Sequence, residues 1–163
     1  MTCLVFSDSH GRCDYIKKAM RRHPDAEVVF FLGDGIADIL SVKLDFPDKA
    51  YLSAFGNCDY FREADGISVD EVGLVTISGK RILYTHGHRM DVKFSLAGLS
   101  AAAVRCGADI VLFGHTHEKL ERYIGEPLPH YLFNPGSIGM GEHTYGVLLL
   151  TDGEPLFSFG SVD

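Results

Sequence analysis

The chain of 163 residues carries 15 Lys and Arg against 22 Asp and Glu, which gives a formal charge of −7. Its length predicts one compact domain over residues 1–163, and its 46% apolar and 23% charged residues are typical of a globular protein. The acidic balance disfavours long nucleic acids and anionic membranes as partners, because both are bound by basic patches.

The first half of the chain alternates predicted strands with predicted helices. Three apolar, β-prone runs predict strands buried on both faces: Cys3–Ser7, Val28–Leu32 and Tyr51–Phe55. Apolar residues at helical spacing predict a helix over Arg12–Arg22, and a shorter helix is expected after Gly35.

The second half is predicted to be richer in strands. Residues 69–85 indicate a hairpin that turns near Gly79, and a third helix is expected from Asp91, through Phe94 and Ala97, to a stop at Gly107. The remaining predicted strands are 109–113, 130–133, 144–150 and 155–159. Together these elements predict an α/β protein: a two-sheet β-sandwich flanked by α-helices, in four layers (α/β/β/α).

The apolar runs and the cysteines indicate in which cellular compartment the protein is expected. The longest apolar runs are far shorter than the ~20 residues that a membrane-spanning helix needs, and no signal-like segment opens the chain. The four cysteines include no C-x-x-C pair, which excludes a zinc ribbon and disfavours a disulfide framework. We therefore expect a cytoplasmic protein without membrane contact.

Polar side chains follow five of the predicted strands. Parallel strands present their carboxyl ends at one sheet edge, so these side chains are expected to meet there. Oxygen and imidazole donors without thiolate suit Mn²⁺, Fe²⁺ or Zn²⁺, and seven ligands exceed what one tetrahedral ion takes. Two ions about 3.5–4 Å apart, bridged by a carboxylate, are therefore expected. The candidate ligands are Asp8, His10, Asp34, Asn57, His86, His115 and His117.

Each of these residues also has a structural explanation. Asp8 could cap a helix or make a turn, Asn57 could make a turn after Gly56, and the His115 pair could lie at a half-buried strand end. Five polar clusters at five strand ends are a much rarer coincidence. The joint pattern favours the metal interpretation.

The motifs resemble a known family. Asp8-x-His10, Gly33-Asp34, Gly56-Asn57, His86 and Gly114-His115-x-His117, in this order, are similar to those of the calcineurin-like metallophosphoesterase superfamily. The variant Gly56-Asn57-Cys58-Asp59 and the later Asn134-Pro-Gly-Ser137 most resemble its small bacterial and archaeal phosphodiesterase branch.

The resemblance implies a dinuclear phosphodiesterase acting on a small phosphoester. Asp8, His10, Asp34 and His117 would hold one ion, and Asp34 would bridge to a second ion completed by Asn57, His86 and His115. A hydroxide bridging the ions would attack phosphorus in line. Mn²⁺ is the favoured metal, with Fe²⁺, Zn²⁺ and Ni²⁺ as alternatives.

The chain also departs from the family pattern. Many relatives carry a proton-donating His after Gly-Asn, but this chain has Cys58, so we expect His88 and Asn57 to be the catalytic side chains. A structural position beside the site is an equal alternative for His88, and the favoured one for Cys58. Asp59, a partner of that His in relatives, has lost its evident role.

Other functions remain open at this stage. A phosphomonoesterase is the nearest rival, and a non-catalytic interaction scaffold, like the retromer subunit that resembles this family, is an alternative from another class. A module holding one metal ion is a third alternative. Neither the physiological substrate nor a homo-oligomeric state follows from the sequence.

Overall fold

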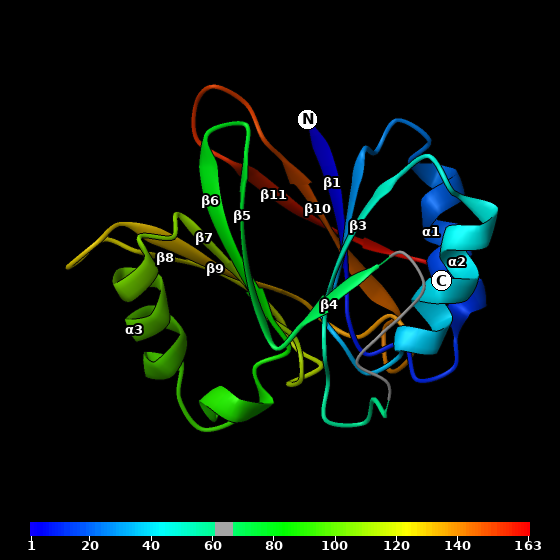
Figure 1. The fold of residues 1–163 in the computed structure, drawn as a ribbon, viewed down its shortest axis with the longest axis horizontal. Helices are drawn as coiled ribbons and strands as arrows, with labels where there is room; N and C mark the ends of the chain where they lie inside the picture. Colours follow the sequence, from blue (N-terminus) through cyan, green and yellow to red (C-terminus); the bar gives the residue numbers. More distant parts are fainter. Residues whose placement is uncertain (61–66) are drawn as a thin grey trace.

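The computed structural model describes residues 1–60 and 67–163. Two β-sheets pack face to face, and helices cover their outer faces (Figure 1). Helices α1 (Cys13–Arg22) and α2 (Ile36–Asp45) lie on one side, and α3 (Ala97–Cys106) lies on the other. This arrangement confirms the predicted two-sheet sandwich flanked by helices.

The larger sheet has six strands in the order β11-β10-β1-β2-β3-β4. Strands β1, β2, β3 and β4 run parallel, and β10 and β11 join antiparallel at one side. The parallel pairing brings the carboxyl ends of β1, β2 and β3 to one edge. The strands are β1 (Thr2–Phe6), β2 (Val28–Phe31), β3 (Ala50–Ala54), β4 (Ser68–Asp70), β10 (Thr144–Leu149) and β11 (Leu156–Ser161).

The smaller sheet has five strands in the order β5-β6-β7-β9-β8. Strands β6, β7 and β9 are parallel, while β5 and β8 pair antiparallel at the two sides. The predicted hairpin near Gly79 is the β5–β6 pair. The strands are β5 (Val72–Ile77), β6 (Lys80–Thr85), β7 (Ile110–Leu112), β8 (Lys119–Ile124) and β9 (His130–Pro135).

Successive side chains of β1 point to opposite faces of the sheet and so pack in different layers of the hydrophobic core. Leu4 and Phe6 pack in the cluster that includes Ile16 and Ile39 of the two covering helices. Cys3 and Val5 point the other way, into the cluster between the sheets. A third cluster joins α3 to the outer face of the smaller sheet. Burial on both faces explains why these strands are continuous apolar runs.

Two predictions about the second half were wrong. The third helix begins at Ala97 and not at Asp91, because Asp91 has φ 53° and follows a single 3₁₀ turn, η1 (His88–Met90). Phe94, expected within this helix, lies before its first residue and is 90% exposed. Strand β8 was missed altogether, because its charged and mostly exposed side chains lack an apolar run.

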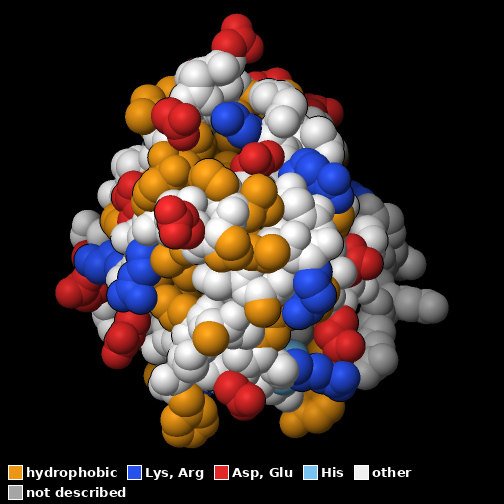
Figure 2. Space-filling view, turned by 90° about the vertical axis from the view of Figure 1, so that its left-hand side faces the viewer, with side chains coloured by type: hydrophobic (Ala, Val, Ile, Leu, Met, Phe, Trp, Pro, Cys, Tyr) orange, Lys and Arg blue, Asp and Glu red, His pale blue; other side chains and the backbone are white. Residues whose placement is uncertain are grey.

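The face that carries α3 shows apolar side chains among charged side chains of both signs (Figure 2). No uniformly basic track of the kind that binds polyanions runs over the described part of this face. Within residues 1–60 and 67–163, the helices are all too short or too polar to cross a membrane.

The core packing generates a stability prediction. Phe30 is fully buried between the sheets, so Phe30→Ala is expected to lower the free energy of unfolding by about 3–5 kcal/mol. Phe94 is the matched control, and Phe94→Ala is expected to change that free energy by less than about 0.5 kcal/mol. Urea denaturation measures both, and equal losses would contradict the assignment of the core.

Candidate metal centre

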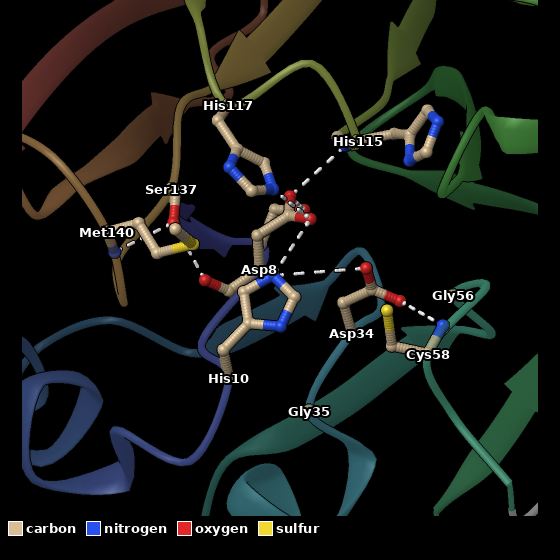
Figure 3. Close-up of polar contacts among 12 residues, drawn as sticks. Asp8, His10, Asp34, Gly35, Gly56, Cys58, His115, His117, Ser137 and Met140 are labelled. Carbon is tan, nitrogen blue, oxygen red and sulfur yellow. Dashed lines mark hydrogen bonds and ion pairs between the residues drawn. The ribbon is translucent and has the colours of Figure 1, made fainter.

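The seven candidate ligands lie on loops at one edge of the sandwich. The loops after β1, β2 and β3 carry three oxygen ligands and His10, and the loops after β6 and β7 carry three histidines. In the close-up, the side chains of Asp8, His10, Asp34 and His117 converge (Figure 3). The ends of parallel strands in both sheets therefore build a single polar centre.

The donors form two neighbouring groups. Asp8, His10 and His117 offer ligand atoms that all lie within 4.8 Å of one another, and Asp34, His86 and His115 do the same. His10 lies between the groups, with its Nε2 atom 3.8 Å from Asp8 Oδ1 and 3.9 Å from Asp34 Oδ2. Such sets of carboxylate and imidazole donors fit divalent metal ions.

Asn57 and Cys58 lie at the margin of these groups. Asn57 Oδ1 is 3.0 Å from His86 Nε2, so its amide oxygen reaches the second group. The Cys58 sulfur forms a third group with His10 and Asp34, again within 4.8 Å. Cys58 is exposed and its thiol lies close to the Asp34 carboxylate (Figure 3).

Five of the candidate ligands have a left-handed backbone. Their φ angles lie between 44° and 67°, in a region that non-glycine residues seldom adopt. Such strain persists only where the surrounding structure enforces it, and it concentrates at functional sites. The five are Asp8, His10, Asp34, His115 and His117.

Asp8 is fully buried and is held by donors from several segments. The neighbouring Ser7 hydroxyl and the His115 N–H both donate to its Oδ2 atom. His117 Nε2 lies 3.1 Å from its Oδ1 atom, and this hydrogen bond raises the pKa of His117. The carboxylate is thus fixed in place while its charge faces the imidazoles.

Asp34 is 3% exposed, and its surroundings lower the pKa of its carboxyl group. Burial by itself would raise its pKa, but the hydrogen bond and charge of His86 and the N–H of Cys58 together lower it. The Cys58 N–H donates to Asp34 Oδ1 at 2.7 Å. A buried carboxylate that stays charged is a strong ligand for a divalent cation.

The imidazole ring of His86 is oriented by a hydrogen bond on the side that faces away from the centre. Its Nδ1 atom lies 2.6 Å from the Leu32 carbonyl oxygen, which assigns the proton to Nδ1 and turns Nε2 toward the centre. Burial lowers the pKa of His86, but the hydrogen bond to Asp34 and the charges of Asp8 and Asp34 outweigh it and raise the pKa. Burial and the charge of His86 lower the pKa of His115 to about 4, which leaves that imidazole a free base.

Asp59 has a role that the sequence did not reveal. Its Oδ1 atom accepts the N–H groups of Gly35 and Ile36, and its Oδ2 atom accepts those of Asp34 and Gly56, all at 2.8–2.9 Å. The carboxylate caps the N-terminus of α2 from another loop and ties the Asp34 loop to the loop that carries Asn57. The only sequence signal was an Asp two residues after a candidate ligand.

The segment Asn134–Ser137, at the end of β9, supports the centre from the smaller sheet. Asn134 Nδ2 donates to the Gly114 carbonyl oxygen at 3.0 Å, and the Ser137 hydroxyl donates to the Asp8 carbonyl oxygen at 2.8 Å. Asp38 of α2 accepts the Ser9 hydroxyl and the Gly11 N–H, so it fastens the loop after β1. These contacts give Asn134, Ser137 and Asp38 structural roles beside the centre.

The geometry of Asp59 generates the second prediction. Asp59→Asn turns two amide hydrogens toward backbone N–H groups, so we expect about 1–3 kcal/mol lower stability and about 10- to 100-fold weaker metal binding. Urea denaturation and calorimetric metal titration measure the two effects. Asp48→Asn removes an exposed carboxylate elsewhere and is the control. Unchanged metal affinity in Asp59→Asn would contradict the positioning role.

Comparisons with known proteins agree with this geometry. Residues 1–153 match the model of the calcineurin-like phosphoesterase superfamily domain. The chain is 30% identical over 155 residues to the probable metallophosphoesterase YsnB of Bacillus subtilis, covering 92% of this chain and 85% of that protein. It is 24% identical over 144 residues to the phosphodiesterase MJ0936 of Methanocaldococcus jannaschii, covering 81% of each.

Among solved structures, a conserved uncharacterized protein from Streptococcus pneumoniae, a predicted phosphoesterase, aligns with TM-score 0.78 and 26% identity. The alignment covers 99% of this chain and 89% of that one. The chain therefore belongs to the calcineurin-like phosphoesterase superfamily, in its small bacterial and archaeal phosphoesterase branch.

Proposed function

We propose that this protein is a metal-dependent phosphodiesterase that binds two divalent ions, with Mn²⁺ as the favoured metal. The observation that carries the proposal is the pair of adjacent donor groups, each with one buried carboxylate and two imidazoles. Asp34 lies between them, with Oδ2 3.9 Å from His10 Nε2 and 3.4 Å from His86 Nε2. The proposed ligands are Asp8, His10, Asp34, Asn57, His86, His115 and His117.

Two divalent ions in this centre would supply Lewis acidity and a water-derived nucleophile near neutral pH. The side chains of the chain do the positioning. Asp34 presents one carboxylate to both groups, while His86 is held in one tautomer by the Leu32 carbonyl oxygen. Asn57 brings its amide oxygen to the second group, and its amide N–H group can donate a hydrogen bond to a phosphate oxygen.

We assign to His88, and not to Cys58, the donation of a proton to the leaving group. The Nδ1 atom of His88 is buried and has no hydrogen-bond partner among residues 1–60 and 67–163. Its ring lies 5.3 Å from that of His86 and 6.1 Å from that of His115. Burial and the charge of Asp34 raise the pKa of the Cys58 thiol, which makes it a weak proton donor.

Asp34→Asn tests the proposal directly. The wild-type protein loaded with Mn²⁺ is expected to hydrolyse bis-p-nitrophenyl phosphate, and Asp34→Asn to lower turnover by at least about 100-fold, because it removes the shared charged ligand. Release of p-nitrophenolate measures the rate, with Asp48→Asn as the control. Elemental analysis should find two equivalents of metal per chain; one equivalent would contradict the dinuclear proposal.

The same experiment separates the alternatives. Faster turnover of p-nitrophenyl phosphate than of the diester would indicate a phosphomonoesterase. A stable protein partner, together with turnover no higher than that of Asp34→Asn under any of several metals, would indicate an interaction scaffold.

His88→Asn tests the leaving-group assignment. Diphenyl phosphate releases a more basic leaving group than bis-p-nitrophenyl phosphate does, so it depends more on proton donation. We expect the substitution to slow diphenyl phosphate hydrolysis by about 100-fold and bis-p-nitrophenyl phosphate hydrolysis by less than about 10-fold. Metal content is measured alongside. Equal losses for both substrates would show that His88 only supports the centre.

A further inference from the structure

A pocket of about 500 Å³ opens directly beside the metal centre. The candidate ligand His117 forms part of its wall, so a group attached to a phosphate at the centre can extend into it. The pocket lies between the start of β8 and the loop that joins β9 to β10. Its walls are made by His117, Glu118, Lys119, Met140, Gly141, Glu142 and Thr144.

The wall that contains Met140 is connected to the metal centre by hydrogen bonds. The Met140 N–H donates to the Ser137 hydroxyl at 3.0 Å, and that hydroxyl donates to the Asp8 carbonyl oxygen at 2.8 Å. Met140 is 50% exposed, and its thioether side chain extends toward Asp8 (Figure 3). The pocket therefore offers a polarizable apolar surface at a fixed distance from the centre.

The charged side chains of the pocket are mostly acidic. Lys119 is its single Lys or Arg, and its ammonium group lies 2.5 Å from the Glu142 carboxylate. The charge of Lys119 is thus matched by Glu142, and the hydrogen bond lowers the pKa of Glu142. Glu118 adds a second carboxylate to the walls. An anionic group entering the pocket would meet a Lys119 ammonium group that is already paired with Glu142, and a second carboxylate on Glu118.

Resting on the proposed function, we infer that this pocket, bounded by His117, Met140 and the Lys119–Glu142 pair, binds the alcohol portion of the substrate and favours an uncharged or cationic alcohol over an anionic one. Phosphoesters whose alcohol carries a carboxylate or a further phosphate are disfavoured. The selectivity belongs to the ester group, because the phosphate itself is bound at the metal centre.

Three phosphonates of similar size test the inference without turnover: 2-aminoethylphosphonate, propylphosphonate and 3-phosphonopropionate. They share the headgroup and differ in the charge of the tail. Calorimetric titration of the Mn²⁺-loaded protein is expected to show about two- to ten-fold weaker binding of the anionic tail than of the other two, the effect of partly screened charges. Glu142→Gln frees Lys119 and is expected to remove or reverse that preference.

Two further variants isolate the pocket from the overall charge of the protein. Asp152→Asn makes the same charge change at the exposed turn after β10, far along that strand from Thr144, and is expected to leave the preference intact. Lys119→Met leaves Glu142 unmatched and is expected to strengthen the preference for the cationic tail. Lys119 and Glu142 have side chains 41% and 73% exposed, so both variants should fold normally.

The outcomes separate this inference from the proposed function. Equal affinities for the three tails, or equal effects of Glu142→Gln and Asp152→Asn, would overturn the inference even if the protein hydrolyses bis-p-nitrophenyl phosphate. Tail-dependent binding that responds only to Lys119 and Glu142 would support it even if no diester is hydrolysed. In that case the proposed diesterase activity alone would fail.

Discussion

The convergence of two buried carboxylates at one edge of the sandwich is the constraint that organises this protein. Asp8 is fully buried and Asp34 is 3% exposed, and both approach His10 Nε2. Burying a charge is costly unless it is paired and hydrogen-bonded. Backbone N–H groups and imidazoles meet part of this need, and the remaining negative charge makes the centre attractive to divalent cations.

Close backbone approach makes the centre compact. A Cβ atom on Gly56 would lie 2.1 Å from Asp34 Oδ1, and one on Gly114 would lie 1.9 Å from Ser7 Oγ. Neither glycine is needed for a positive φ angle, since Gly56 and Gly114 are not among the glycines that have one. The loops of β1, β2, β3 and β7 can therefore meet only where side chains are absent.

The sequence predicted which side chains lie together better than it predicted the helices and strands around them. Buried parallel strands combine continuous apolar runs with abrupt polar ends, so both the strands and their convergence follow from one pattern. That pattern fails for β8, whose exposed charged residues carry no apolar run, and for the start of α3, where Phe94 fits a helical stripe but lies in solvent. Asp59 was missed because it binds backbone N–H groups, which leave no signature in the residue pattern of those loops.

The division between a fixed centre and an exposed pocket suggests how selectivity can change without loss of the chemistry. Asp59, Asn134 and Ser137 fasten the ligand loops through hydrogen bonds to backbone atoms, so the centre depends on the whole fold. The Lys119–Glu142 pair is exposed, and exposed ion pairs contribute little to the stability of a fold. Substitutions there alter the charge that a substrate meets at little cost to folding. Under the proposed function, phosphate binding would thus be tied to the fold, while the choice of alcohol would rest on exposed side chains whose substitution leaves the fold intact.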